Sequence, residues 1–344
     1  MKYMESINRS LHTLLEQDER VLLLGEDLLD PYGGAFKVTK GLSTRFPDRV
    51  IPTPISESSI TGVSTGLALR GFRPVMEIMF GDFLTLCTDQ LVNGATKFAW
   101  MYGDEVSVPM VIRTPMGGRR GYGPTHSQTL DALYMSVPGL TMVAPGPYHD
   151  PGVLLKTAVL EDDGPLLFIE NKLLYPGELL VPDASGRCGD LFVRTISQGD
   201  SRWPTISLCP ARNSTPDVTL IAYGGSAHLA AKAAVEALIE EEILVEVLLP
   251  SLIKPVPWED LEDRVRESGR VVTVEEGVLT GGWGAEVAAG LQSRLFHALR
   301  APIQRVAALD QPIPSAKHLE DAVLPGREDI LEAIRNCTGD QVHV

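Results

Sequence analysis

Short apolar runs alternate with longer amphipathic segments along most of the chain. The amphipathic segment 6–17 precedes the apolar run 20–27, and the alternation continues to about residue 171. Apolar residues at helical spacing indicate a helix, and a short apolar run that ends in turn residues is typical of a buried strand. We predict strands at 73–80, 107–115, 140–146 and 165–171, with helices at 83–100 and 151–162. This order predicts a parallel sheet covered by helices on both faces.

The alternation stops near residue 179 and resumes near residue 217. Segment 183–216 is rich in Pro, Gly, Ser and Asp, which predicts an interdomain linker. Beyond it we predict strands at 217–225, 244–250, 270–276 and 303–309, and helices at 227–241, 258–268 and 284–296. The chain is therefore expected to hold two α/β domains, each a three-layer α/β/α unit, at 1–182 and 217–344.

Composition and charge narrow the class of protein. A chain of 344 residues is long enough for two domains, and 44% hydrophobic residues can build a sizeable core. The net charge of −15 argues against non-specific binding to nucleic acid or to an anionic membrane, because a polyanion would be repelled. We find no run approaching the ~18 apolar residues of a membrane span.

The cysteines and the N-terminal sequence indicate the compartment. Four cysteines are scattered without a C-x-x-C pair, which favours neither a disulfide framework nor a zinc site. The first 27 residues have no basic segment followed by an apolar core, so no secretory signal is apparent. We expect a cytoplasmic protein.

Three local features bear on chemistry. Glu57 lies in "TPISESSI", just before a small-residue segment that reads as a helix, where serine caps and a first-turn acid are favoured in any protein. His126 ends the glycine-rich loop "GGRRGYGPTHSQ", which follows a strand, the place where α/β proteins bind ligands. Phe80 and Phe83, in "EIMFGDF", are core aromatics on local evidence alone. No nucleotide-type phosphate loop and no compact metal-ligand spacing is present.

Many motifs occur together in a fixed order. They include "GEDLLDPYGGAFKVTKGL", "TPISESSITG", "GFRPVMEIMFGDF", "THSQ", "VPGLTMVAPG", "FIENKLLYP", "VTVEEGVLTGGWGAEVAAG" and "RVAALDQPIPSAKHLED". With them the chain resembles, over nearly its whole length, the beta subunit of the thiamine-diphosphate-dependent component of 2-oxo acid dehydrogenase complexes. The resemblance implies a pyrimidine-binding domain followed by a transketolase-type C-terminal domain.

The resemblance also implies roles for four residues. Glu57 matches the glutamate that faces N1′ of the cofactor's aminopyrimidine, where a shared proton activates the cofactor. Phe83 matches the aromatic that packs on the pyrimidine ring, and Met79 lies one strand step before it. His126 matches the active-site histidine that assists proton transfer and positions the incoming lipoyl group.

The cofactor and partners follow from the same resemblance. Related enzymes hold the diphosphate through Mg²⁺ with "GDG" and a later "NN", and neither string occurs here. The resemblance therefore implies thiamine diphosphate shared with a Mg²⁺-binding alpha subunit in an α2β2 heterotetramer, a lipoyl-bearing acyltransferase core as a second partner, and a small 2-oxo acid as substrate. It extends to a structural K⁺ that some relatives bind in the loop matching 158–165, although this loop is one residue longer than usual. Ser59 also stands where the family usually has Gly.

Three functions remain open at this point. The first is the beta subunit of a 2-oxo acid dehydrogenase, which decarboxylates a 2-oxo acid and transfers the acyl group to lipoamide. The second is half of a split transketolase or an acyloin-forming carboligase, which would pass the carbanion to an aldehyde. The third is a scaffold that kept the fold and lost catalysis, and intact Glu57, Phe83 and His126 count against it.

Overall fold

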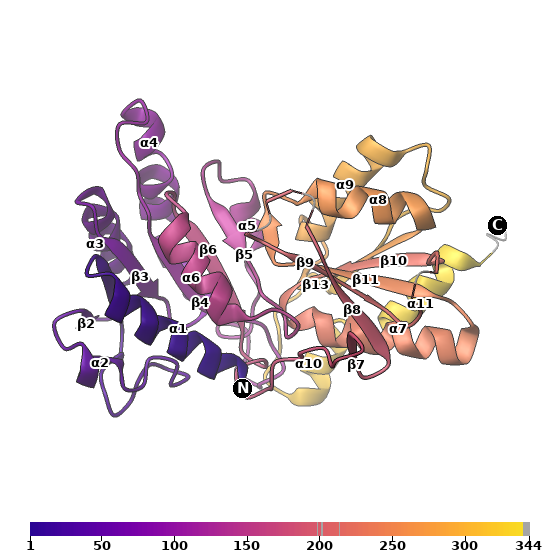
Figure 1. Ribbon diagram of the computed structural model, residues 1–344, viewed down its shortest axis with the longest axis horizontal. Helices are drawn as coiled ribbons and strands as arrows, with labels where there is room; N and C mark the ends of the chain where they lie inside the picture. The colour runs from indigo at the N-terminus through magenta and orange to yellow at the C-terminus, as the bar shows by residue number, and fades with distance from the viewer. Residues whose placement is uncertain (198, 201, 213, 340–344) are drawn as a thin grey trace. The chain divides into compact units, whose positions relative to one another are not determined.

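The chain folds into two compact units (Figure 1). A computed structural model describes residues 1–197, 199–200, 202–212 and 214–339. The first unit consists of Met1–Met116, Leu133–Val143 and Asp150–Leu179, and the second of Gly117–Ala132, Ala144–His149 and Leu180–Val344. The unit boundary thus differs from a single cut near residue 182, because two early segments belong to the second unit.

The first unit is built on a parallel sheet, as predicted. Its strands follow the order β5-β6-β4-β3-β1-β2, and the neighbours pair in parallel. Strands β1, β4 and β6 are buried along their full length, which explains why apolar residues are so frequent in them. The strands are β1 (Val21–Gly25), β2 (Val50–Pro52), β3 (Arg73–Glu77), β4 (Val111–Met116), β5 (Thr141–Val143) and β6 (Leu166–Asn171).

Helices pack on this sheet. The helices here are α1 (Tyr3–Gln17), α2 (Leu42–Arg45), α3 (Glu57–Leu69), α4 (Phe98–Met101), α5 (Ala132–Met135) and α6 (Pro151–Glu161). Helix α6 begins as its sequence predicts: Asp150 accepts hydrogen bonds from the amides of Gly152 and Val153, and Pro151 occupies the first turn. Helix α1 packs on α6, where the Ser10 hydroxyl donates to the carbonyl of Gly152 at 2.6 Å.

The helix predicted over 83–100 is not a regular α-helix. The segment contains the 3₁₀ helix η1 (Gly81–Cys87), the π-helix η2 (Gln90–Ala95) and then α4. The hydroxyls of Thr85 and Thr88 donate to the carbonyls of Asp82 and Leu84, and such side-chain bonds compete with α-helical ones. Gly94 lies inside η2 and further weakens helix propensity.

The second unit contains a mixed sheet with strand order β14-β13-β10-β11-β9-β8-β7. Helices α8 and α9 lie on one side of it, and α7 and α11 lie on the other, so this unit has three layers (Figure 1). The remaining bounds are β10 (Val218–Ala222), η3 (Gly224–Ser226), α7 (Ala227–Glu241), β11 (Val245–Pro250), β12 (Leu252–Lys254), α8 (Trp258–Ser268), β13 (Val271–Val278), α9 (Trp283–Leu295), β14 (Gln304–Ala308), α10 (Lys317–Val323) and α11 (Arg327–Thr338).

Segment 183–216, which we predicted to be a linker, contains three strands. They are β7 (Arg187–Cys188), β8 (Leu191–Ile196) and β9 (Thr205–Cys209), and β9 pairs antiparallel with β11. Leu191, Ile206 and Leu208 join the core of the second unit. The Pro, Gly, Ser and Asp residues that suggested a linker therefore concentrate in the turns around these strands. The described part of this segment belongs to the second sheet.

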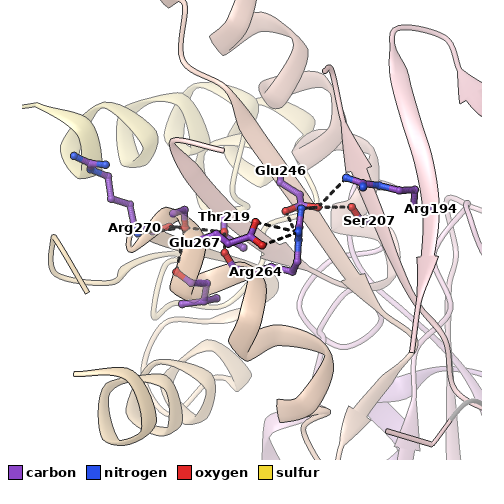
Figure 2. Close-up of polar contacts among 9 residues, drawn as sticks. Arg194, Ser207, Thr219, Glu246, Arg264, Glu267 and Arg270 are labelled. Atoms are coloured by element: carbon purple, nitrogen blue, oxygen red, sulfur yellow. Dashed lines mark hydrogen bonds and ion pairs between the residues drawn. The ribbon is translucent and has the colours of Figure 1, made fainter. Parts of the chain in front are cut away.

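A buried carboxylate connects β8 and β9 to other elements of the second unit (Figure 2). Glu246 on β11 is fully buried and accepts a hydrogen bond of 2.5 Å from Ser207 on β9. Arg264 on α8 binds both of its oxygens, at 2.8 and 2.9 Å, and Arg194 on β8 lies at 3.8 Å. Four elements thus meet at one carboxylate, which explains why the segment does not behave as a free connection.

Candidate active site

Glu57 is the first residue of α3, directly after Ser56 at the helix N-cap position. Only 5% of the residue is exposed. The helix macrodipole favours a negative charge at this position. A carboxyl group here can share a proton with a ligand that reaches the start of α3.

A second buried carboxylate lies against Glu57. Glu26 follows β1, is 4% exposed, and leaves its Oε1 buried without a hydrogen-bond partner. Burial, and next the charge of Glu57, raise the pKa of Glu26, while the amide of Ser56 donates to its carboxylate and opposes that shift. Glu26 was not among the site residues that we predicted. The available signal was its place at the carboxyl end of a parallel strand, where α/β proteins bind ligands.

Aromatic side chains lie beside this acid pair in the first unit. The Cys87 thiol contacts the carbonyls of Glu57 at 3.7 Å and Phe83 at 3.9 Å, so η1 lies next to the start of α3. The rings of Phe80 and Phe83 meet edge to face with centroids 5.8 Å apart. Met79 is partly buried in the connection between β3 and η1. Glu57 and Phe83 are thus parts of one cluster, with Met79 on the adjoining segment.

His126 lies in the second unit, in the loop that follows β4. It is partly buried, its Nδ1 is 2.9 Å from the Thr125 hydroxyl, and its amide donates to the carbonyl of Gly123 at 3.3 Å. Of the four predicted site residues, the structure groups Glu57, Met79 and Phe83 in the first unit and holds His126 in the second.

The first sheet also contains a buried ionic network. Arg113 on β4 binds Glu77 on β3 at 2.8 Å and both oxygens of Glu170 on β6 at 2.7 and 2.9 Å. The Tyr175 hydroxyl donates to Glu170 at 2.7 Å. Because every charge is paired and bidentate geometry is met, the network holds three neighbouring strands in register.

The acid pair is suited to proton sharing with a nitrogen heterocycle. A buried carboxyl group can hold or accept a proton there, and the neighbouring aromatic rings offer a surface for a flat ring. In the described part of the chain, no group of three or more His, Cys, Asp or Glu residues is arranged to hold a metal ion.

Comparison with known proteins places this geometry in a family. Residues 1–178 match the transketolase pyrimidine-binding domain, and residues 209–330 match the transketolase C-terminal domain. The chain is similar in fold to a solved structure described as a split-gene transketolase, an inactive beta4 tetramer, with a TM-score of 0.72, 22% identity and 98% of each chain covered. At that identity the likeness shows the fold alone.

Proteins similar in sequence identify the family more narrowly than the fold does. The beta-1 subunit of the mitochondrial pyruvate dehydrogenase E1 component of Arabidopsis thaliana is 36% identical over 98% of this chain and 89% of the relative. The E1 beta subunit of Dictyostelium discoideum is 34% identical over 97% and 90%, and that of Rickettsia felis is 34% identical over 96% of each. The chain therefore belongs to the pyruvate dehydrogenase E1 beta subunit family, with a transketolase pyrimidine-binding domain and a transketolase C-terminal domain.

Proposed function

We propose that this chain acts as the beta subunit of a thiamine-diphosphate-dependent 2-oxo acid dehydrogenase. Its complex decarboxylates a small 2-oxo acid oxidatively and transfers the acyl group to lipoamide. The observation that carries the proposal is the pair of buried acids Glu57, at the start of α3, and Glu26, whose Oε1 is buried without a hydrogen-bond partner. Its relatives bear the name of this dehydrogenase component, which favours this reaction over a split transketolase or a carboligase.

The residues present fit the pyrimidine end of thiamine diphosphate. When bound, the cofactor supplies the electron sink for decarboxylation. Glu57 would hold a proton at N1′ of the pyrimidine, and the adjacent Glu26 has a buried Oε1 that lacks a partner. Phe83 would support one face of the ring and Met79 would border it. The two carboxyl groups and the Phe83 ring would thus orient the pyrimidine and control the proton at N1′.

The other half of the cofactor needs a second chain. The described residues contain no acidic or histidine cluster for Mg²⁺, which supports an alpha subunit as the holder of the metal and the diphosphate. We extend the proposal to an α2β2 heterotetramer that delivers the acyl group to a lipoyl-bearing acyltransferase core. The four free cysteines are consistent with a cytoplasmic location. None of the described helices has the length and apolar character needed to cross a membrane.

We propose no potassium ion for the loop 158–165. Two of its backbone carbonyls, those of Val159 and Asp162, accept hydrogen bonds of 2.8 and 3.0 Å from the guanidinium of Arg73. Arg73 also pairs with Asp163 at 2.9 Å. Because a cationic group already satisfies these oxygens, we assign no K⁺ to this loop.

The test is an activity assay on the complex with the alpha subunit. Wild type and Glu57→Gln are compared for 2-oxo acid decarboxylation with an artificial electron acceptor. We expect Glu57→Gln to lose about 10²–10⁴-fold in turnover while it keeps its fold and partner, because an amide cannot share the proton. Glu5→Gln is the matched control, since Glu5 also lies in a first helical turn but is exposed. Near-normal turnover of Glu57→Gln would refute the role of this residue.

The same complex separates the dehydrogenase from a carboligase. Acylation of a lipoyl domain is expected in the presence of a 2-oxo acid. A complex that forms no acyl-lipoamide but releases a hydroxyketone when an aldehyde is supplied would be a carboligase instead.

A further inference from the structure

Within the second unit, a buried acid on α10 binds the loop that carries His126. Glu320 on α10 is 1% exposed, and its two carboxylate oxygens accept hydrogen bonds from two loop amides. Oε1 accepts from the amide of Arg119 at 2.6 Å, and Oε2 accepts from the amide of Gly121 at 3.2 Å. Charge-assisted bonds of this kind are stronger than neutral ones, so Glu320 fixes the loop backbone and not merely a side chain.

Further contacts hold the same part of the loop. The amide of Gly118 donates to Glu276, a partly buried residue of β13, at 2.8 Å. The Arg119 guanidinium binds Asp321 at 3.0 Å and the carbonyl of Pro325 at 2.7 Å. At the far end of the loop, the Tyr223 hydroxyl donates to Asp131. His126 lies between these two attachments.

The fit between the loop and α10 is tight and includes backbone strain. A Cβ added at Gly118 would lie 2.5 Å from the Leu324 side chain and 3.2 Å from Glu320. Arg119 has φ of 66°, a left-handed conformation that is unfavourable for a residue with a side chain. Strain of this kind persists only where the surroundings fix it, and Glu320 bonds to the amide of the strained residue itself.

We propose that Glu320 is a positioning residue that sets the place of His126 for acyl transfer. The inference rests on the proposed function, in which His126 assists transfer to the lipoyl group. Glu320 acts through the backbone of residues 118–121, since its carboxylate bonds there and not to the histidine. The carboxylate is needed because it supplies an acceptor to each of two amides, whereas a glutamine supplies one acceptor and one donor.

The experiment uses the complex with the alpha subunit and two readouts. Reduction of a small dye reports decarboxylation, and acylation of a lipoyl domain reports transfer. Glu320→Gln should lower acylation by about 10- to 100-fold, the scale of a misplaced catalytic group, and should change dye reduction far less. Glu328→Gln is the matched control, because Glu328 on α11 is exposed and pairs with the side chain of Arg327, away from the loop. It should leave both rates close to wild type.

A double variant distinguishes positioning from general damage. If Glu320 acts through His126, Glu320→Gln combined with His126→Ala should transfer acyl groups no more slowly than His126→Ala alone, because coupled residues are not additive. Losses that multiply, or equal losses in both readouts, would overturn the inference. If Glu320→Gln fails to fold, Gly118→Ala is the second variant, because its added methyl group pushes the loop away from Leu324. It should lower acylation far more than dye reduction. Equal losses in the two readouts of Gly118→Ala would also overturn the inference.

The outcome also separates this inference from the proposed function. If His126→Ala selectively loses acylation and Glu320→Gln does not, the role of Glu320 is refuted and that of His126 stands. No selective loss in His126→Ala overturns both roles, while the loss of turnover in Glu57→Gln would still support the decarboxylase.

Discussion

The Tyr223 hydroxyl donates a hydrogen bond of 2.5 Å to the fully buried carboxylate of Asp131. Tyr223 follows β10, and Asp131 ends the loop that carries His126, so the bond joins residues 92 positions apart within the second unit. Burial raises the pKa of Asp131, opposed by the bond from Tyr223. The carboxylate also accepts from the amide of Ala132 at 2.9 Å, at the start of α5.

Tyr223→Phe should destabilise the protein by about 1–3 kcal/mol, because it leaves a buried acceptor with one partner fewer. The ring contact with Trp283, at 4.9 Å between centroids, is preserved in the variant, so packing is not at issue. Urea unfolding of the full chain measures the difference. An unchanged midpoint would mean that this bond contributes nothing to stability.

Glu275 should make stability depend on pH. Burial, and next the charge of Asp131, raise the pKa of Glu275 to about 7. A hydrogen bond from the amide of Gly284 and the positive charge of Arg305 oppose this shift. The unfolded value is about 4.3, so between roughly pH 4.3 and 7 the folded state binds more protons than the unfolded state. The free energy of unfolding should therefore fall as pH rises through this window, by about 1–3 kcal/mol from this group.

Glu275→Gln removes that titration and is the matched variant. Its unfolding free energy should fall less steeply than that of wild type between pH 5 and 7.5, and the gap between the two proteins should change across the window. Parallel slopes would show that Glu275 does not titrate there in the folded state.

The isolated chain should bind thiamine diphosphate weakly, even with Mg²⁺ present. In the proposed site, Glu57 and Phe83 would bind the pyrimidine end of the cofactor, and the alpha subunit would hold the metal and the diphosphate. Calorimetry on the single chain and on the complex with the alpha subunit makes the comparison. Tight, Mg²⁺-dependent binding by the single chain would contradict the shared site.

Glu170→Gln should destabilise the first unit by about 3–5 kcal/mol, because it leaves the buried Arg113 short of a charged partner. Both residues are at most 1% exposed. Asp163→Asn is the control: its ion pair with Arg73 involves a side chain that is 75% exposed, and such pairs contribute about 0–1 kcal/mol. Similar small losses in the two variants would show that the buried network is not a main source of stability.

The sequence determined the features that depend on near neighbours. The apolar runs predicted β1, β3, β4 and β6, since strands buried on both faces are rich in apolar residues. Asp150 and Pro151 predicted the start of α6. The serines before Glu57 predicted a helix start, and α3 begins at Glu57 itself.

Only the tertiary structure decided the features that depend on distant partners. Segment 183–216 is turn-rich in sequence, yet β9 forms strand pairs with β11 some 40 residues later, and local propensity does not encode that pairing. Segment 83–100 has helical periodicity, but threonine hydroxyls and Gly94 break its α-helical bonding. Glu26 and Glu320 show their roles only where the fold places them, against Glu57 and against the loop of His126, because burial and hydrogen-bond geometry are properties of the folded chain.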